Sequence, residues 1–143
     1  MIRITLLILI GLSSLSFAEF SKENGVVSDS ISKLEWQDDY TNNGGEIKQL
    51  TWSESINYCE SLTLNGGGWR LPNIKELISV IEDTTYNPSI NSIFEFIVSD
   101  NYWSSTVNVN GNNYAWIVYF SSGSIHVYNK KHTNYVRCVR AGE

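Results

Sequence analysis

The chain has 143 residues and a formal net charge of −5 at pH 7, and 42% of its residues are hydrophobic and 13% aromatic. A chain of this length forms one domain that buries about two-thirds of its unfolded surface. The acidic balance argues against a nucleic-acid partner, because phosphate backbones are bound by clustered lysines and arginines. The aromatic content indicates large flat side chains in a core, on a binding surface, or in both places.

The first 18 residues have the pattern of a secretory signal peptide. A charged start at Arg3 precedes an apolar run over 6–12 and the small-residue site Ser16-Phe17-Ala18. Cleavage after Ala18 leaves one domain, residues 19–143, without the amino-terminal cysteine that a lipid anchor needs. No later stretch reaches the roughly 18 apolar residues of a spanning helix. We therefore expect a periplasmic, secreted or cell-surface protein whose mature chain has no transmembrane segment.

The two cysteines, Cys59 and Cys138, are expected to form one disulfide, because export takes the chain to an oxidising compartment. Closing so long a loop removes denatured-state entropy worth on the order of 4 kcal/mol in the chain-entropy model. The alternative is a redox or nucleophilic cysteine. That role needs a nearby partner, such as a second cysteine in a Cys-x-x-Cys motif or a catalytic histidine.

Alternating apolar and polar residues over 24–37 predict two short strands with a turn at Asp29-Ser30. The polar stretch 38–46 is predicted to be a surface loop. Thr51 and Glu54 then have the spacing of a capping box, which predicts a helix start.

The first helix has a predicted buried stripe at helical spacing, and glycines follow it. Its members are Trp52, Ile56, Cys59 and Leu62. Asn65 to Gly68 is predicted to end this helix, because glycine adopts left-handed conformations without steric cost.

A second helix is predicted to begin at the capping-box pair Asn73 and Glu76 and to stop near Asp83. Its apolar stripe falls at i, i+3, i+4 and i+7. The stripe consists of Ile74, Leu77, Ile78 and Ile81. Residues 84–100 follow as an irregular stretch with a short helical turn.

The last third of the chain is predicted to be strands, which cover 101–107, 114–120, 124–128 and 135–140. A tight hairpin turn separates the second of these strands from the third, and a longer polar turn separates the third from the fourth. The fold class is therefore α+β, a mostly antiparallel sheet with two helices on one side. The disulfide then joins the first helix to the last strand.

Six short strings in this order and spacing resemble the Lcl C-terminal domain family over nearly all the mature chain. They are Leu34-Glu35-Trp36-Gln37, Tyr58-Cys59, Gly68-Trp69-Arg70-Leu71-Pro72 with Lys75-Glu76-Leu77, Tyr102-Trp103-Ser104-Ser105-Thr106, Ala115-Trp116, and Tyr135-Val136-Arg137-Cys138-Val139-Arg140. The resemblance implies a C-type-lectin-like fold, related to that of formylglycine-generating enzymes. It also implies a disulfide from the first helix to the last strand.

The same resemblance implies an exported, adhesin-like module, generally without catalysis. The adhesin domain that names the family is associated with sulfated polysaccharide. We carry over the fold and not this ligand, because binding a polyanion requires a concentrated basic surface and this chain is acidic.

Other patterns indicate structural roles. Gly66 to Gly68 lacks the Lys-Ser/Thr of a phosphate-binding loop, and Arg70 is expected to fix the turn before the second helix rather than to face a ligand. Four tryptophans are assigned to packing, which are Trp36, Trp69, Trp103 and Trp116.

No catalytic residue, metal site or cofactor is predicted. His126 and His132 lack partners at zinc spacing, although Asp83, Asn87 and Asp100 could supply calcium ligands if folding gathers them. The cysteine pair that formylglycine-generating enzymes use for catalysis is here expected to be a structural bridge. No Ser-His-Asp arrangement stands out.

The leading hypothesis is therefore a non-enzymatic binding module that recognises a glycan or an envelope protein. Its predicted ligand surface is the polar and aromatic hairpin region near the carboxyl end. The residues of this surface are Asn112, Tyr119, Tyr128, Lys130, Lys131 and His132. The alternatives are an envelope enzyme that acts on cell-wall polymers through residues distant in sequence, and a structural subunit.

Overall fold

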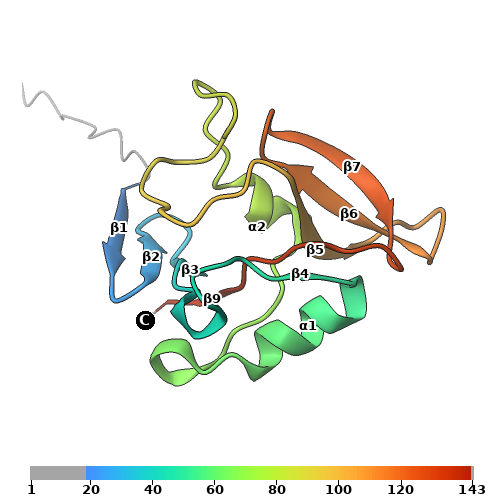
Figure 1. The fold of residues 1–143 in the computed structure, drawn as a ribbon. Coiled ribbons are helices and arrows are strands. Elements are labelled where there is room, and N and C mark those ends of the chain that lie inside the picture. Colours follow the sequence, from blue (N-terminus) through green and yellow to red (C-terminus); the bar gives the residue numbers. More distant parts are fainter. Residues whose placement is uncertain (1–18, 143) are drawn as a thin grey trace, which may run out of the picture.

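The computed structural model describes residues 19–142, and in this range it is an α+β structure with two α-helices and two mostly antiparallel sheets (Figure 1). The predicted α+β class is therefore confirmed. The predicted signal peptide, residues 1–18, lies outside the described residues. No described helix has the length and apolarity needed to cross a bilayer.

A four-stranded antiparallel sheet joins the two ends of the described chain. Its order is β1 (Phe20–Glu23), β2 (Val26–Asp29), β3 (Leu34–Gln37) and β9 (Val139–Ala141). The two strands predicted over 24–37 correspond to β2 and β3, and β1 is an additional strand. Asn24 and Gly25 have positive φ values of 50° and 76°, as in the tight turn that best matches the twist of a hairpin.

A five-stranded sheet forms the second layer, in the order β4 (Gln49–Leu50), β8 (Asn134–Tyr135), β5 (Asn101–Val107), β6 (Tyr114–Tyr119) and β7 (Ser124–Asn129). Only the β5–β8 pairing within it is parallel. The prediction of one strand over 135–140 is wrong. The chain leaves the second sheet after β8 and enters the first as β9, because the intervening Arg137 turns inward to the carbonyl of Gln37.

Both predicted helix starts are confirmed. Helix α1 (Trp52–Ser61) begins after Thr51, whose N–H donates to the Glu54 carboxylate at 2.9 Å. Helix α2 (Ile74–Ile78) begins after Asn73, whose Oδ1 accepts from the Glu76 N–H at 2.9 Å. These contacts satisfy backbone donors that have no partner inside a helix.

Both helices end earlier than predicted, and short 3₁₀ turns lie elsewhere. Helix α1 ends at Ser61, before the 3₁₀ turn η2 (Leu64–Gly66), and η1 (Thr41–Asn43) lies in the loop after β3. Helix α2 ends at Ile78 instead of near Asp83, because Val80 rather than Ile81 enters the core and its carbonyl accepts from a later loop.

The helices cover opposite faces of the five-stranded sheet, not one side as predicted. Leu77 of α2 packs in one core cluster with Tyr102. Cys59 of α1 packs in the other cluster with Trp103. Adjacent residues of a strand point to opposite faces, so the sheet lies between the two helices. We call these faces the α2 face and the α1 face.

The predicted disulfide is confirmed. Cys59 of α1 is bonded to Cys138, with a Cα–Cα distance of 5.4 Å, and both residues are fully buried. Since Cys138 precedes β9, the bond ties the helix beneath the second sheet to the strand that closes the first.

Candidate functional site

The outer hairpin of the five-stranded sheet, β6 and β7, extends beyond the helices (Figure 1) and carries two exposed tyrosines, Tyr114 and Tyr128. A glycine closes its turn. Gly123 has a φ of 74°, and a Cβ there would lie 2.9 Å from Cγ2 of Ile81. A side chain at this position would therefore strain the backbone and press the hairpin away from the segment after α2.

The strand register decides which side chains of the hairpin share a face. Ile117 lies between Trp103 on β5 and His126 on β7, so these three share the α1 face. Tyr119 lies two residues after Ile117, and Tyr128 lies two residues after His126. Since side chains two residues apart on a strand share a face, both tyrosines also point to the α1 face.

The α1 face contains a hollow of about 340 Å³ next to the open edge of the sheet. We call it the tyrosine groove. It is lined by Asp100, Asn101, Ile117, Tyr119, His126 and Tyr128. Ile117 is fully buried, Tyr119 is half-buried, and Tyr128 is 38% exposed. The groove thus combines an apolar base and aromatic rings with carboxylate, amide and imidazole groups.

Backbone pairing positions the polar residues of the groove. The Asp100 carbonyl accepts from the Phe120 N–H at 3.0 Å, and Asn101 pairs with Tyr119 across the strands. The Asp100 carboxylate also accepts from the Asn101 N–H at 2.7 Å. These residues sit at the start of β5, before the register shift between Trp103 and Val107, and backbone pairing there holds them in place without a ligand.

Two rings flank Tyr128. Trp103 contacts it edge-on with ring centroids 6.3 Å apart, and His132 also contacts it edge-on at 5.6 Å. A second hollow of about 300 Å³ lies beyond Tyr128 and is also lined by His132, Tyr114, Val127 and Asn129. Tyr128 therefore lies between two hollows with its orientation set by its neighbours.

A larger hollow, about 620 Å³, lies elsewhere, between the loop before β4 and residues 95–98. Its charged lining is mixed, with Glu46, Lys48 and Glu95. The Glu95 carboxylate is already paired with Lys22 Nζ at 2.9 Å.

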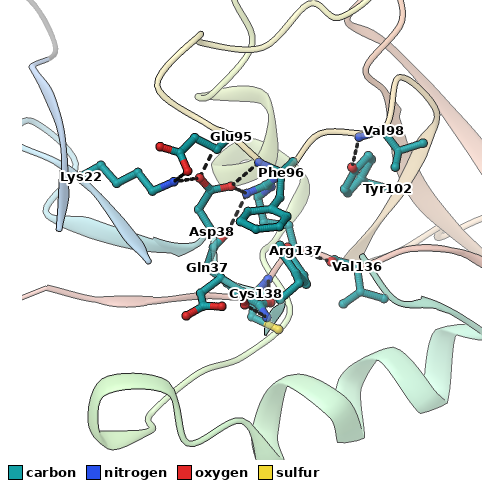
Figure 2. A network of polar contacts seen from close by, with 12 residues as sticks. Lys22, Gln37, Asp38, Glu95, Phe96, Val98, Tyr102, Val136, Arg137 and Cys138 are labelled. Atoms are coloured by element: carbon teal, nitrogen blue, oxygen red, sulfur yellow. Dashed lines mark hydrogen bonds and ion pairs between the residues drawn. The ribbon is translucent and has the colours of Figure 1, made fainter. Parts of the chain in front are cut away.

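Behind this hollow lies a buried charge network centred on Asp38, shown in Figure 2. The Asp38 carboxylate accepts from Lys22 Nζ at 2.6 Å and from Arg137 Nη1 at 3.0 Å. It also accepts from the backbone N–H groups of Glu95 and Phe96. The side chains of Asp38 and Arg137 are both fully buried. The prediction of a surface loop over 38–46 is therefore wrong for Asp38.

Arg137 completes this network with carbonyl acceptors and aromatic rings. Its guanidinium donates to the Gln37 carbonyl at 2.6 Å and to the Phe96 carbonyl, and it lies 4.5 Å from the Phe94 ring. Tyr40, also buried in the predicted surface loop, lies 5.9 Å away. The Asp38–Arg137 pair at the centre of the network is closed to solvent, and it holds distant segments together.

The pKa shifts in the network follow from burial and pairing. Burial lowers the pKa of Lys22, but the carboxylates of Asp38 and Glu95 outweigh burial, and the pKa is raised. Burial raises the pKa of Tyr40 far above its ordinary value despite the nearby Arg137. Lys22 therefore stays charged and Tyr40 neutral throughout the ordinary pH range.

The sequence of residues 25–140 matches the family model described as Lcl C-terminal domain. The chain belongs to this family. The match covers both cysteines, both helices and the tyrosine groove. No curated protein matches the chain.

In the structure of this Lcl C-terminal domain, the six predicted ligand residues do not line one common hollow. Tyr119 and Tyr128 both line the tyrosine groove, and His132 lies beyond Tyr128 in the second hollow. Lys130 Nζ lies 3.9 Å from the centroid of the Trp52 ring. Lys130 therefore packs on α1 instead of facing either hollow.

Asn112 and Lys131 are exposed and line neither hollow of the Lcl C-terminal domain hairpin. Asn112 lies in the loop before β6, whose first residue pairs with the last residue of β7. The structure thus places Asn112 near the Lys130 end of the hairpin and Tyr119 at the opposite end.

Sequence reasoning missed Asp100, Asn101 and His126 as groove residues. A signal existed for His126, since it has the same parity as Tyr128 on one predicted strand. Asp100 and Asn101 belong to another strand, and only the register of β5 against β6 brings them to Tyr119.

Arg70 and the tryptophans have the structural roles that the sequence predicts. The Arg70 guanidinium forms two bonds with the Glu76 carboxylate at 2.8 and 2.7 Å, so Arg70 fixes the turn before α2 as expected. Trp36, Trp69 and Trp103 are buried, and Trp116 is half-buried. Within residues 19–142, no cluster of His, Cys, Asp and Glu side chains could hold a metal ion.

Proposed function

We propose that this chain is an exported, non-enzymatic module of the cell envelope that binds glycans in the tyrosine groove. The observation that carries the proposal is the grouping of two tyrosines with Asp100, Asn101 and His126 around one hollow. Sugar rings present apolar C–H faces and hydroxyl edges. Aromatic rings stack on such faces, and carboxylate, amide and imidazole groups bond to hydroxyls.

The chemistry of the groove favours a neutral glycan over a sulfated one. Asp100 contributes negative charge to the lining, and the chain carries a net charge of −5. The nearby Lys130 packs on Trp52. A polyanion would therefore meet unfavourable electrostatics along the groove.

Export and the lectin-like fold belong to the same proposal. The apolar run and small-residue site at the amino terminus support export, and the buried disulfide suits an oxidising compartment. If the proposal is right, the protein recovered from the envelope fraction begins at Glu19, which mass spectrometry of the intact chain measures.

The test is binding of the purified, oxidised protein to an array of neutral and sulfated glycans, followed by titration calorimetry on the strongest ligand. Tyr128→Ala should weaken binding about tenfold, since losing one stacked ring removes on the order of 1.4 kcal/mol. Tyr86→Ala is the matched control, because Tyr86 is 75% exposed and lies outside the groove.

Three results would contradict the proposal. They are the absence of saturable glycan binding, equal weakening by the Tyr86 and Tyr128 variants, and chemical conversion of the glycan during incubation. Conversion would instead support the envelope enzyme, and mass spectrometry of the recovered ligand detects it.

A further inference from the structure

Strand β7 is an unprotected edge of the five-stranded sheet. It is the last strand in the sheet order, and Figure 1 shows it at the outer side of the hairpin. Four consecutive residues of it are exposed, and the apolar ones have high exposed fractions: Ile125 44%, Val127 37% and Tyr128 38%. Within residues 19–142, β6 is the only strand that pairs with β7, so the other edge of β7 has no strand partner.

The other sheet edges are short or charged. Strand β1 carries Lys22 and Glu23, β4 has two residues, and β9 has three residues that include Arg140. Strand β7 has six residues, Ser-Ile-His-Val-Tyr-Asn, without lysine, arginine, carboxylate or proline. Folded proteins use such residues to prevent pairing between sheet edges. Strand β7 is the one long edge strand of the described chain without such residues, which indicates an edge that is kept available for pairing.

The direction of the backbone groups defines how this edge can pair. Phe120 N–H donates to the Asp100 carbonyl on the β5 side, so the odd-numbered residues of the preceding strand bond to β7. They pair with the even-numbered residues of β7, including His126. The backbone groups of Ile125 and Val127 therefore point to the open edge.

We propose that β7 pairs antiparallel with β7 of a second copy of this chain, about a two-fold axis at His126. In this register Ile125 lies opposite Val127 of the second copy, and each such pair exchanges both backbone hydrogen bonds. The two His126 residues face each other as a pair without direct backbone bonds.

A second copy fits this edge because the strand is complementary to itself. On the α2 face, Ile125 and Val127 of both copies form one apolar cluster. On the α1 face, the small Ser124 lies opposite the large Tyr128. Each copy carries a net charge of −5, so two copies repel each other overall. Strand β7 itself has no charged side chain, and pairing through it therefore keeps the electrostatic repulsion between the copies low.

The dimer does not depend on the glycan proposal, but it has a consequence for it. A two-fold axis perpendicular to the sheet keeps the α1 faces of both copies on the same side. The two tyrosine grooves would then open in the same direction.

The first test is cross-linking in the otherwise unchanged protein. Facing residues without direct backbone bonds have Cα atoms about 4.5 Å apart, which is within disulfide range. His126→Cys should therefore give a disulfide-linked dimer on a non-reducing gel. Ser124→Cys is the matched control. Its mate in the second copy lies about 13 Å away along the strand, so it should remain largely monomeric.

The second test measures association without a cross-link, by sedimentation over a concentration series. Val127→Lys should weaken self-association at least tenfold, since it brings like charges together at the edge. Val109→Lys makes the same change at a residue that is 91% exposed outside the strands and should have no effect.

Several outcomes would overturn the dimer. They are a wild-type protein that stays monomeric at every concentration, an assembly of three copies, equal cross-linking of both cysteine variants, and equal effects of both lysine variants. Binding of an extended peptide at β7 in place of self-association would also overturn it. Loss of glycan binding with an intact dimer would overturn only the proposed function.

Discussion

At the scale of single residues, the decisive feature is a buried aspartate in a segment that reads as a surface loop. Asp38 is 1% exposed and lies between Lys22 and Arg137, residues from opposite ends of the domain. A buried carboxylate is tolerated only when charges and donors compensate for lost hydration. Asp38 therefore couples β1, the 95–96 segment and the chain before β9.

Asp38→Asn should lower the free energy of unfolding by about 3–5 kcal/mol, because it leaves the buried Arg137 without its counter-charge. Urea unfolding followed by tryptophan fluorescence measures the change. Glu95→Gln is the matched control, since the Glu95 side chain is 72% exposed and pairs with the same Lys22. It should cost under about 1 kcal/mol. Equal losses in both variants would show that Asp38 is not the centre of the network.

At the scale of elements, the turn before α2 is held by one carboxylate with two roles. Glu76 accepts from the Asn73 N–H at 2.8 Å as part of the capping box, and it pairs with Arg70. Burial by itself raises the pKa of Glu76. The hydrogen bonds from Arg70 and Asn73 lower it by more than burial raises it, so the net pKa lies below the usual value. The charged form of Glu76 therefore stabilises the helix start.

A carboxyl with a lowered pKa stabilises the fold above its unfolded pKa of about 4.3, and the contribution is lost as pH falls through the folded pKa. The wild-type free energy of unfolding should therefore fall between about pH 5 and pH 3. Glu76→Gln should reduce this fall, as urea titrations at several pH values measure. Glu60→Gln removes an exposed glutamate of α1 and should leave the slope unchanged. Identical slopes for wild type and Glu76→Gln would contradict the role of Glu76.

At the scale of the whole molecule, the chain around Cys138 fastens the two sheets and α1 together. Cys138 is bonded to α1, the preceding Arg137 reaches Asp38, and Arg140 donates to the carbonyl oxygens of Leu64 and Gly67 at 3.3 and 2.8 Å. These contacts join segments that are distant in sequence. The architecture therefore depends on the last few residues of the domain.

Replacing both cysteines with alanine should lower the free energy of unfolding by about 4 kcal/mol, because the bond closes a loop between positions 79 residues apart. Thermal and urea unfolding measure the loss. Wild-type protein kept reduced serves as the control and should show the same lowered stability. Equal stability of the oxidised and reduced wild type would mean that packing alone sets the position of β9.

Local patterns were sufficient for the elements whose determinants are close in the chain. Capping boxes at Thr51 and Asn73 predicted both helix starts, and alternation predicted β5 with its observed ends. Helix ends were less accurate, since burial of Val80 ended α2 early. Strand β1 was missed although Asn24-Gly25 is a strong hairpin signal.

By itself, the sequence determined the α+β class, the helix starts, the disulfide and the alternation of side chains along the late strands. Each of these depends on residue spacing along a helix or strand, or on the chemistry of a single pair. Only the tertiary structure decided the burial of Asp38, the split of the last predicted strand between two sheets, and the arrival of Asp100 and Asn101 beside the tyrosines. Those features depend on strand register and on partners up to about a hundred residues away, which no local pattern encodes.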